Sequence, residues 1–270
     1  MNYQELVLSK TPSAYIPYNS NNQSDAIGTL PSSYVTVDLN PSFDYVEKRH
    51  GIRSKKIGHA GSGTYDSRRF DGTNRYRYVH GECWIYIPTA TLTDNIELMY
   101  WGSSYTGSTY DSHIRILSTR YVRFTTQSGD LGTYDNVLNS TSQIPFNTWT
   151  HIAWQFSNGV KKIFINGVLN STVTVTSHVL ARYIWEGSYA AQTCYMDEWM
   201  FWTGSNSSVI PSDSDILQRA TFPLTKTKWW DISTLQWVRS GDEKYWDGTQ
   251  WISMQNMIYK NWNGSSWITI

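Results

Sequence analysis

Short apolar runs of strand length follow one another through most of this sequence, and they constrain the fold more than any other feature. Helical periodicity is confined to residues 3–9 and 211–220. The clearest strand-like runs, each bounded by Gly, Ser, Asn, Asp or Pro, are 81–88, 96–102, 112–119, 121–126, 149–156 and 161–166. Strands at this spacing without intervening helices predict an antiparallel sandwich or barrel, not βαβ units.

The turns between the best runs have a physical basis. Asn158-Gly159 and Asn166-Gly167 each stand between two apolar segments, and Asn-Gly readily adopts positive φ at both central positions of a tight hairpin. The stretch from 149 to 175 is therefore predicted to be a three-stranded meander whose side chains alternate between core and solvent. Ser212 is the expected N-cap of the second helix, with Asp213 and Asp215 in its first turn, where acidic groups complement the helix dipole.

Two segments of this meander resemble a known family. The run W-T-H-I-A from Trp149 and the run K-K-I-F-I-N-G from Lys161 are similar to a hairpin of concanavalin-A-like, laminin-G-like jelly rolls. Weaker matches occur in the family's order at Y-Q-E-L-V-L from Tyr3, F-D-G from Phe70 and Y-M-D-E-W from Tyr195. The resemblance implies an all-β, antiparallel two-sheet jelly-roll sandwich over residues 1–222. Residues 29–63 depart from the family pattern and leave the early strand order open.

Residues 223–270 form a different, repetitive segment. K-W-W-D at 228, K-Y-W-D at 244 and K-N-W-N at 260 recur every 16 residues, and each unit ends in a second tryptophan followed by a β-branched residue. Turns between the two halves of each unit would make three hairpins. The cross-strand tryptophan pairs expected in them are Trp230 with Trp237, Trp246 with Trp251, and Trp262 with Trp267.

The hairpin units resemble units of phage tail and head-surface proteins. An isolated two-stranded hairpin is marginal in water, so the array is expected to need packing or oligomerisation, with a trimer as one form. The tryptophans are interpreted as the core of stacked hairpins, with exposed rings that stack on a carbohydrate as the alternative.

Charge and hydropathy exclude several partners. The chain has 22 basic and 22 acidic residues, for a formal charge of zero, so no global field attracts nucleic acid. No apolar run reaches the ~18 residues of a membrane span, and the sequence opens without a signal-like segment. Membrane insertion and export are not expected. One basic segment is interpreted as a solvated loop face, or alternatively as a docking surface for an acidic partner: Lys48, Arg49, Arg53, Lys55, Lys56, Arg68 and Arg69.

The motifs of enzymes and metal sites are missing from the sequence. No Glu-x-Asp-x-x-Glu occurs, and adjacent Asp197 and Glu198 on a strand should point to opposite faces. No histidine pair has zinc-ligand spacing, and His113 and His151 are expected to be solvent-facing or hydrogen-bonded. We therefore predict no catalytic residue and no metal centre.

Two cysteines cannot build a disulfide framework. Cys83 and Cys194 are interpreted as small buried residues in strands, with a single bridge between them as the alternative.

A loop rim is the predicted place for ligands. Aromatic side chains there could stack on a host glycan, with polar neighbours beside them, and the candidate residues are Tyr105, Tyr110, Tyr134, Asp135 and Asn136. Calcium is a weaker prediction at the same rim, through Asp130, Asp135 and Asn136, because hard oxygen ligands suit it.

Three function classes then compete. A non-catalytic, lectin-like surface protein of a phage virion, serving capsid decoration or host-glycan attachment, is the leading hypothesis. Other virion proteins and further copies of the chain would be its partners. A cellular carbohydrate-binding adhesin or lectin is the alternative, and a glycan hydrolase or lyase, which needs clustered carboxylates, comes last.

Overall fold

The computed structural model divides the chain into two units, Met1–Leu224 and Thr225–Ile270. The structure describes the backbone of residues 3–16, 32–36, 42–44, 54–57, 66–71, 78–88, 92, 95–102, 110–126, 136–175, 183–186, 194–222, 229–231, 236–238, 244–246, 251–253, 260–262 and 267–269. It describes the side chains of residues 3–16, 78–88, 92, 95–99, 112–126, 137–175 and 194–222.

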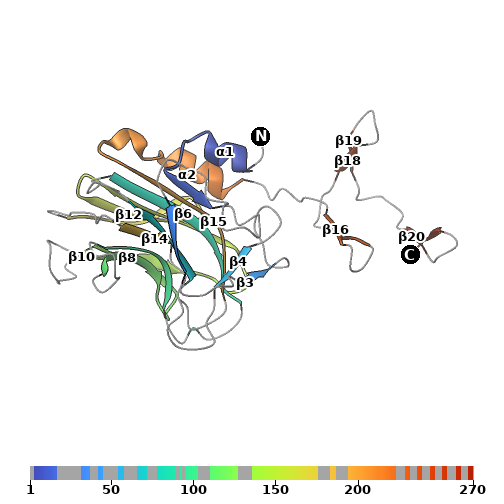
Figure 1. Cartoon of the computed structure of the whole chain (residues 1–270), viewed down its shortest axis with the longest axis horizontal. Coiled ribbons are helices and arrows are strands. Elements are labelled where there is room, and N and C mark those ends of the chain that lie inside the picture. The colour runs from blue at the N-terminus through green and yellow to red at the C-terminus, as the bar shows by residue number, and fades with distance from the viewer. Residues whose placement is uncertain are drawn as a thin grey trace. The chain divides into compact units, whose positions relative to one another are not determined.

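The first unit is built from two antiparallel sheets that face each other (Figure 1). Sheet A has the order β13-β12-β11-β6-β15-β4-β3, with β1 also paired to β15. Its strands are β1 (Ala14–Ile16), β3 (Ser42–Asp44), β4 (Ser54–Ile57), β6 (Tyr78–Tyr86), β11 (Thr150–Ser157), β12 (Val160–Ile165), β13 (Val168–Thr174) and β15 (Cys194–Gly204).

Sheet B has the order β10-β9-β8-β7-β14-β5-β2. Its strands are β2 (Ser32–Thr36), β5 (Asp66–Asp71), β7 (Ile96–Gly102), β8 (Tyr110–Ile116), β9 (Tyr121–Thr126), β10 (Asn136–Gln143) and β14 (Tyr183–Glu186). The two sheets confirm the prediction of an all-β, antiparallel sandwich. They also supply the strand order that the sequence left open, because β2 joins sheet B whereas β3 and β4 join sheet A.

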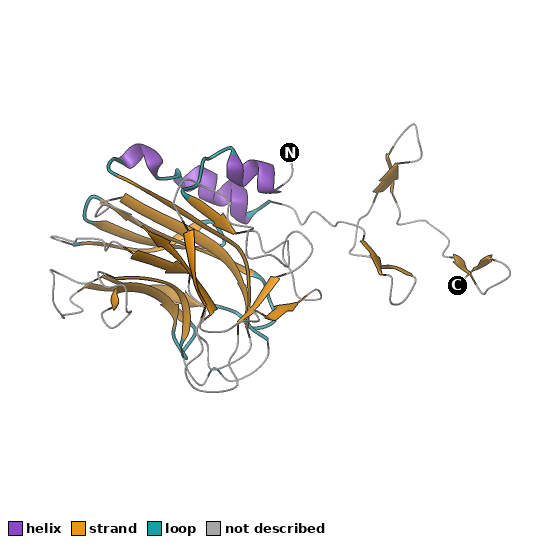
Figure 2. Ribbon diagram, viewed as in Figure 1, coloured by secondary structure: helices purple, strands orange, loops and turns teal. Residues whose placement is uncertain are grey.

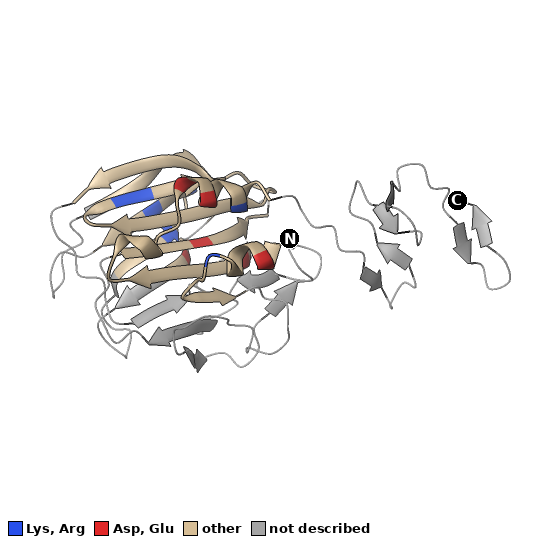
Figure 3. Cartoon of the chain, turned by 90° about the horizontal axis from the view of Figure 1, so that it is seen from above, with Lys and Arg blue, Asp and Glu red and all other residues tan. Residues whose placement is uncertain are grey.

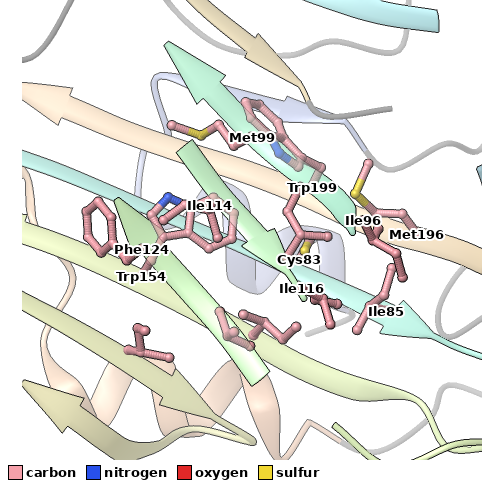
Figure 4. Close-up of a cluster of buried hydrophobic side chains, with 14 of the residues drawn as sticks. Cys83, Ile85, Ile96, Met99, Ile114, Ile116, Phe124, Trp154, Met196 and Trp199 are labelled. Atoms are coloured by element: carbon pink, nitrogen blue, oxygen red, sulfur yellow. The ribbon is translucent and has the colours of Figure 1, made fainter. Parts of the chain in front are cut away.

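Apolar side chains from both sheets fill the space between them (Figure 4). Trp154 of β11 and Phe124 of β9 are both fully buried in this cluster. Gly81 of β6 lies against the Trp154 indole, and a Cβ at Gly81 would be only 2.3 Å from Trp154 Cζ2. The largest ring in this part of the core therefore requires a glycine on the neighbouring strand.

Cys83 and Cys194 belong to the same cluster, and both are buried thiols that form no disulfide. This confirms their interpretation as small buried residues of two strands.

Two short helices lie on the outer face of sheet A (Figure 2). They are α1 (Tyr3–Leu8) and α2 (Asp213–Ala220), and a 3-10 turn at Ser207–Val209 precedes α2. Ser212 caps α2 as predicted: its hydroxyl accepts from the Asp215 backbone N–H, and the Asp215 carboxylate accepts from the Ser212 N–H. Neither helix is long and apolar enough to span a bilayer, and the same holds wherever else the chain is described.

The two predicted Asn-Gly turns occur in the meander β11-β12-β13. Asn158 and Gly159 have φ values of 47° and 80°, and Asn166 and Gly167 have 51° and 78°. The expected alternation of buried and exposed side chains was wrong for β11, whose residues are buried on both faces up to Phe156. The reason is that Ile216 of α2 packs on Ala153 and Phe164 from outside the sheet.

The second unit contains three separate two-stranded pairs. The strands are β16 (Trp229–Asp231), β17 (Gln236–Val238), β18 (Lys244–Trp246), β19 (Trp251–Ser253), β20 (Lys260–Trp262) and β21 (Trp267–Thr269). The cross-strand partners by register are Trp230 with Trp237, Trp246 with Trp251, and Trp262 with Trp267.

Candidate functional site

The outer face of sheet A carries a buried charge network beneath the two helices. Glu82 of β6 receives two hydrogen bonds from Arg219 of α2, and the one from Arg219 Nε to Glu82 Oε2 measures 2.8 Å. His80 Nε2 lies 2.5 Å from Glu82 Oε1, and His151 Nε2 lies 3.0 Å from Glu82 Oε2. All four side chains are completely buried.

These contacts determine the charge of the network. Although burial opposes ionisation of Glu82, the Arg219 guanidinium and the two imidazoles hold the pKa of its carboxyl well below its usual range. Burial lowers the pKa of His80, so this imidazole is neutral and donates its Nε2 proton. Every oxygen of Glu82 is thus occupied by a protein donor, and the network anchors α2 to sheet A.

The acidic pair Asp197 and Glu198 of β15 is also part of sheet A. Glu198 has a φ of 53° within an irregularity of the β15 register between Asp197 and Met200. The expected strand alternation of Asp197 and Glu198 was therefore wrong. Tyr15 donates a hydrogen bond to Glu198, and Asp197 Oδ1 accepts from the Glu198 N–H at 2.9 Å.

Both carboxyls of this pair are buried. Burial and the Asp197 charge raise the pKa of Glu198 well above its usual range. Glu198 is hydrogen-bonded to Tyr15 of the same protein, so we interpret the acidic pair as structural.

Both basic and acidic residues occur along the strands and helices on this side of the first unit (Figure 3). The outer face of sheet B is different, because a single row of polar side chains crosses four of its strands in register. Glu97 of β7 lies opposite Arg115 of β8, Arg115 lies opposite Arg123 of β9, and Arg123 lies opposite Asn139 of β10. Their neighbours Ile114, Ile116, Val122, Phe124 and Leu138 point into the core, so this row, the polar row, faces outward.

The contacts within the polar row are incomplete. Arg115 Nε lies 3.3 Å from Glu97 Oε2, and Arg123 Nε donates to Asn139 Oδ1 at 3.0 Å. Glu97 Oε1 is buried yet has no hydrogen-bond partner among the described residues. Burial raises the pKa of Glu97 to about 8, although Arg115 opposes the shift. At neutral pH the carboxyl is therefore largely protonated and can donate as well as accept.

A second row lies beside the first on the same face. His113 of β8 lies opposite Thr125 of β9, and Thr125 lies opposite Val137 of β10. Arg115 Nη2 donates to His113 Nδ1 at 3.0 Å. Burial, together with the charges of Arg115 and Arg123, lowers the pKa of His113 to about 3, so the imidazole is neutral with its proton on Nε2.

Thr125 is 2% exposed, and its hydroxyl has no hydrogen-bond partner within the described part of the chain. The face thus combines charged donors, a protonated acid and a hydroxyl with unused hydrogen-bonding capacity.

His113 and His151 are both buried in the folded protein. His113 and His151 are 5% and 0% exposed, and both make hydrogen bonds. The solvent-facing alternative was wrong, and the hydrogen-bonded alternative is confirmed.

A buried lysine lies where β12 meets the core. Lys161 Nζ lies 5.1 Å from the centre of the Phe124 ring. Burial lowers its pKa to about 7. A cation held against an aromatic face and removed from water is a costly arrangement, and the sequence did not indicate it.

The predicted glycan residues fall mostly outside the described part. Tyr105, Tyr134 and Asp135, like the calcium candidate Asp130, lie outside the described residues. Tyr110 begins β8 and Asn136 begins β10, both in sheet B, but their side chains are not described. Among the described residues, no group of three or more His, Cys, Asp or Glu side chains could hold a metal ion.

The basic segment divides between the two sheets. Lys55 and Lys56 lie on β4 in sheet A, and Arg68 and Arg69 lie on β5 in sheet B. Lys48, Arg49 and Arg53 are outside the described residues. The tryptophans of the repeats are described only through the backbone pairing given above.

The polar row was missed by the sequence prediction, although the pattern contained a signal for it. In S-H-I-R-I and Y-V-R-F-T the polar residues alternate with apolar ones, which places His113, Arg115 and Arg123 on one face. This alternation does not give the register of the strands, and the register is what places Arg115 opposite Arg123.

Part of the chain is similar to a known protein family, and most of it is similar in fold to solved structures. Residues 81–210 match the family model described as the concanavalin A-like lectin/glucanases superfamily, of the laminin-G type. The fold is a concanavalin A-like jelly roll. The match runs from β6 to the 3-10 turn and thus includes the polar row. No curated protein sequence matches the chain.

Solved structures share the jelly roll at low identity. The binding domain of botulinum neurotoxin serotype D has 13% identity and a TM-score of 0.56, with 87% of this chain and 57% of that chain covered. Domain 4 of AbnA, a GH43 extracellular arabinanase from Geobacillus stearothermophilus solved with arabinotriose, has 17% identity and a TM-score of 0.56, with 78% and 98% covered.

A structure of botulinum neurotoxin type C, whose cell entry depends on interaction with two ganglioside molecules, has 15% identity and a TM-score of 0.55, with 88% and 58% covered. The chain thus spans little more than half of the toxin structures. At these identities the likeness concerns the jelly-roll fold.

Proposed function

We propose that this protein is a non-catalytic, lectin-like protein of a phage virion surface that binds glycans through the outer face of sheet B. The observation that carries the glycan-binding part is the polar row from Glu97 to Asn139, with the neighbouring Thr125 hydroxyl. Arg115 and Arg123 of this row are partly exposed and Asn139 is exposed, so their polar groups are within reach of a hydroxyl-rich ligand.

Two of the similar structures support a saccharide as that ligand. The arabinanase domain was solved with a bound arabinotriose, and the type C toxin depends on gangliosides. A non-catalytic role is supported by the described carboxyls, because Glu82 and Glu198 are buried and bonded to the protein's own side chains.

Glycan binding is tested with the full chain on a glycan array, followed by titration of each hit. The double variant Thr125→Val, Asn139→Leu removes two polar groups of the face and should weaken binding at least tenfold. The matched control is Thr174→Val, a similar change at an exposed position of β13, which should bind normally. An array with no hit, or equal affinity of the double variant, contradicts the assignment.

The enzyme alternative has its own measurement. Each glycan that binds is incubated with the protein, and its mass is followed over a day. We expect every glycan to be recovered intact. Cleavage, or loss of an unsaturated fragment, would identify a hydrolase or lyase instead.

The virion location is supported by the 16-residue tryptophan repeat and its resemblance to phage head and tail units. Electron microscopy of particles with and without the protein tests it: a density that disappears from the head indicates decoration, and one that disappears from the tail indicates attachment. If the particles never contain the protein, the virion role is contradicted and the cellular adhesin remains as the alternative. The expected association with further copies of the chain, a trimer among the forms, is measured by light scattering.

A further inference from the structure

Two arginines occupy directly opposed positions on the outer face of sheet B. Arg115 and Arg123 are register partners on β8 and β9, and side chains in this relation start about 5 Å apart at Cβ. Like charges directly opposite each other destabilise a sheet. A pair of this kind therefore requires compensating negative charge.

The described surroundings do not supply that charge in full. Arg115 contacts Glu97 and the neutral His113, whereas Arg123 is hydrogen-bonded only to the neutral Asn139 amide within the described part of the chain. Glu97, with its pKa of about 8, is mostly uncharged at neutral pH. Burial is the main cause of the depressed pKa of His113, and the positive charges of Arg115 and Arg123 lower it further.

The donors around the pair are arranged for an anion. Arg115 Nε faces Glu97, and within the described part of the chain Arg123 hydrogen-bonds only through its Nε, to Asn139. Planar guanidinium groups bind carboxylates through two parallel hydrogen bonds. The Thr125 hydroxyl and Glu97 Oε1 are buried in the same two rows, so the two guanidinium groups are the contacts that this part of the face offers to a ligand.

We infer that Arg115 and Arg123 together bind the carboxylate of an acidic saccharide. This inference rests on the proposed glycan-binding function and assigns its substrate class: sugars that carry an acid group are preferred to neutral sugars of the same size. Glu97 and Asn139 position the two guanidinium groups from either end of the polar row.

The test compares 3′-sialyllactose with lactose, which differ by one acidic sugar, in calorimetric titrations of the full chain. We expect the acidic sugar to bind at least tenfold more tightly at low salt and to lose affinity as salt rises. Arg123→Gln should remove that preference and leave the weak affinity for lactose. Arg123→Lys keeps the charge but lacks the planar guanidinium with its parallel donors, so its preference for the acidic sugar should be intermediate.

Controls separate the possible outcomes. Lys162→Gln removes an exposed cation of sheet A and should leave both affinities unchanged, and thermal unfolding verifies that each variant is folded. Equal affinity for the two sugars overturns the inference but not the proposed function. A preference for the acidic sugar that survives Arg123→Gln also overturns it. Inorganic phosphate that competes as well as 3′-sialyllactose would reveal a general anion site and overturn the saccharide assignment.

If neither sugar binds and the array is also empty, the proposed function itself fails.

Discussion

At the scale of single residues, the most consequential side chain of the first unit is Glu82. Its carboxylate is removed from water, a change that costs several kcal/mol per ion, and four donors from three side chains compensate for that cost. Removing one member of such a group leaves the others buried and unpaired. The network is therefore a sensitive point for stability.

We expect Arg219→Met to destabilise the first unit by about 3 to 5 kcal/mol, because Glu82 would remain buried without its cation. The double variant Glu82→Gln, Arg219→Met should recover part of that loss. Chemical denaturation followed by tryptophan fluorescence measures both. Lys162→Met, which breaks the exposed pair with Asp213, is the control and should cost at most about 1 kcal/mol. An equal effect of the two single variants would contradict the anchoring role.

Glu97 should make the stability of the first unit depend on pH. Its folded pKa of about 8 lies above its ordinary value of 4.5, so folding takes up a proton between these limits and stability falls as pH rises through that window. Glu97→Gln cannot ionise and should reduce the difference in unfolding free energy between pH 5 and pH 8. Denaturant titrations at both pH values measure it, and an unchanged difference would mean that Glu97 is ionised in the folded protein.

Short-range features of this chain could be predicted from its sequence, whereas contacts between distant residues could not. The positive φ values of Asn158 and Asn166 follow from two adjacent residues, and they were predicted. The pairing of Glu82 with Arg219 joins residues 137 positions apart. Nothing in either local sequence identifies the other, so the pairing could not be predicted.

At the scale of elements, helix α2 depends on its cap as well as on its anchor. We expect Ser212→Ala to destabilise the unit by about 1 kcal/mol, because it removes the hydroxyl that accepts from the Asp215 N–H. Gln218→Ala, at an exposed position of the same helix, should stay within about 0.5 kcal/mol of the parent. Thermal unfolding of the two variants compares them directly. Indistinguishable midpoints would show that the cap contributes nothing beyond the Arg219 anchor.

The element boundaries show where periodicity is informative. Strands β7 and β9 begin and end where the sequence predicted, because each is a single apolar alternation closed by turn residues. The double-sided burial of β11 was not predicted, since a strand covered by a helix has no polar face to mark it. The polar row has the opposite problem: its alternation is visible, but register depends on loops far from the strands.

At the scale of the whole molecule, the two units differ in how they are stabilised. The first has two sheets, an extensive core and a buried ionic network. The second has three two-stranded pairs, and such pairs are marginal unless their faces are covered. We therefore expect the first unit to be stable by itself and the second to need contacts that cover the faces of its strand pairs.

A chain that ends at Leu224 should keep the unfolding midpoint of the first unit, because its core lies within residues 1–224. If the tryptophan repeats drive self-association, this shortened chain should be monomeric where the full chain is larger. Multi-angle light scattering and calorimetry measure the two properties. A shortened chain that still associates would place the contact on the sandwich, and a lowered midpoint would show that the repeats stabilise it.

The distance along the chain between Glu82 and Arg219 also affects synthesis. A ribosome completes every strand of the sandwich before it adds the arginine that neutralises Glu82. Until then, the buried Glu82 carboxylate has its two histidine partners but lacks its arginine. Helix α2 therefore completes the ionic network only at a late stage of synthesis. Nascent chains that lack α2 should be less stable and more accessible to proteases and chaperones.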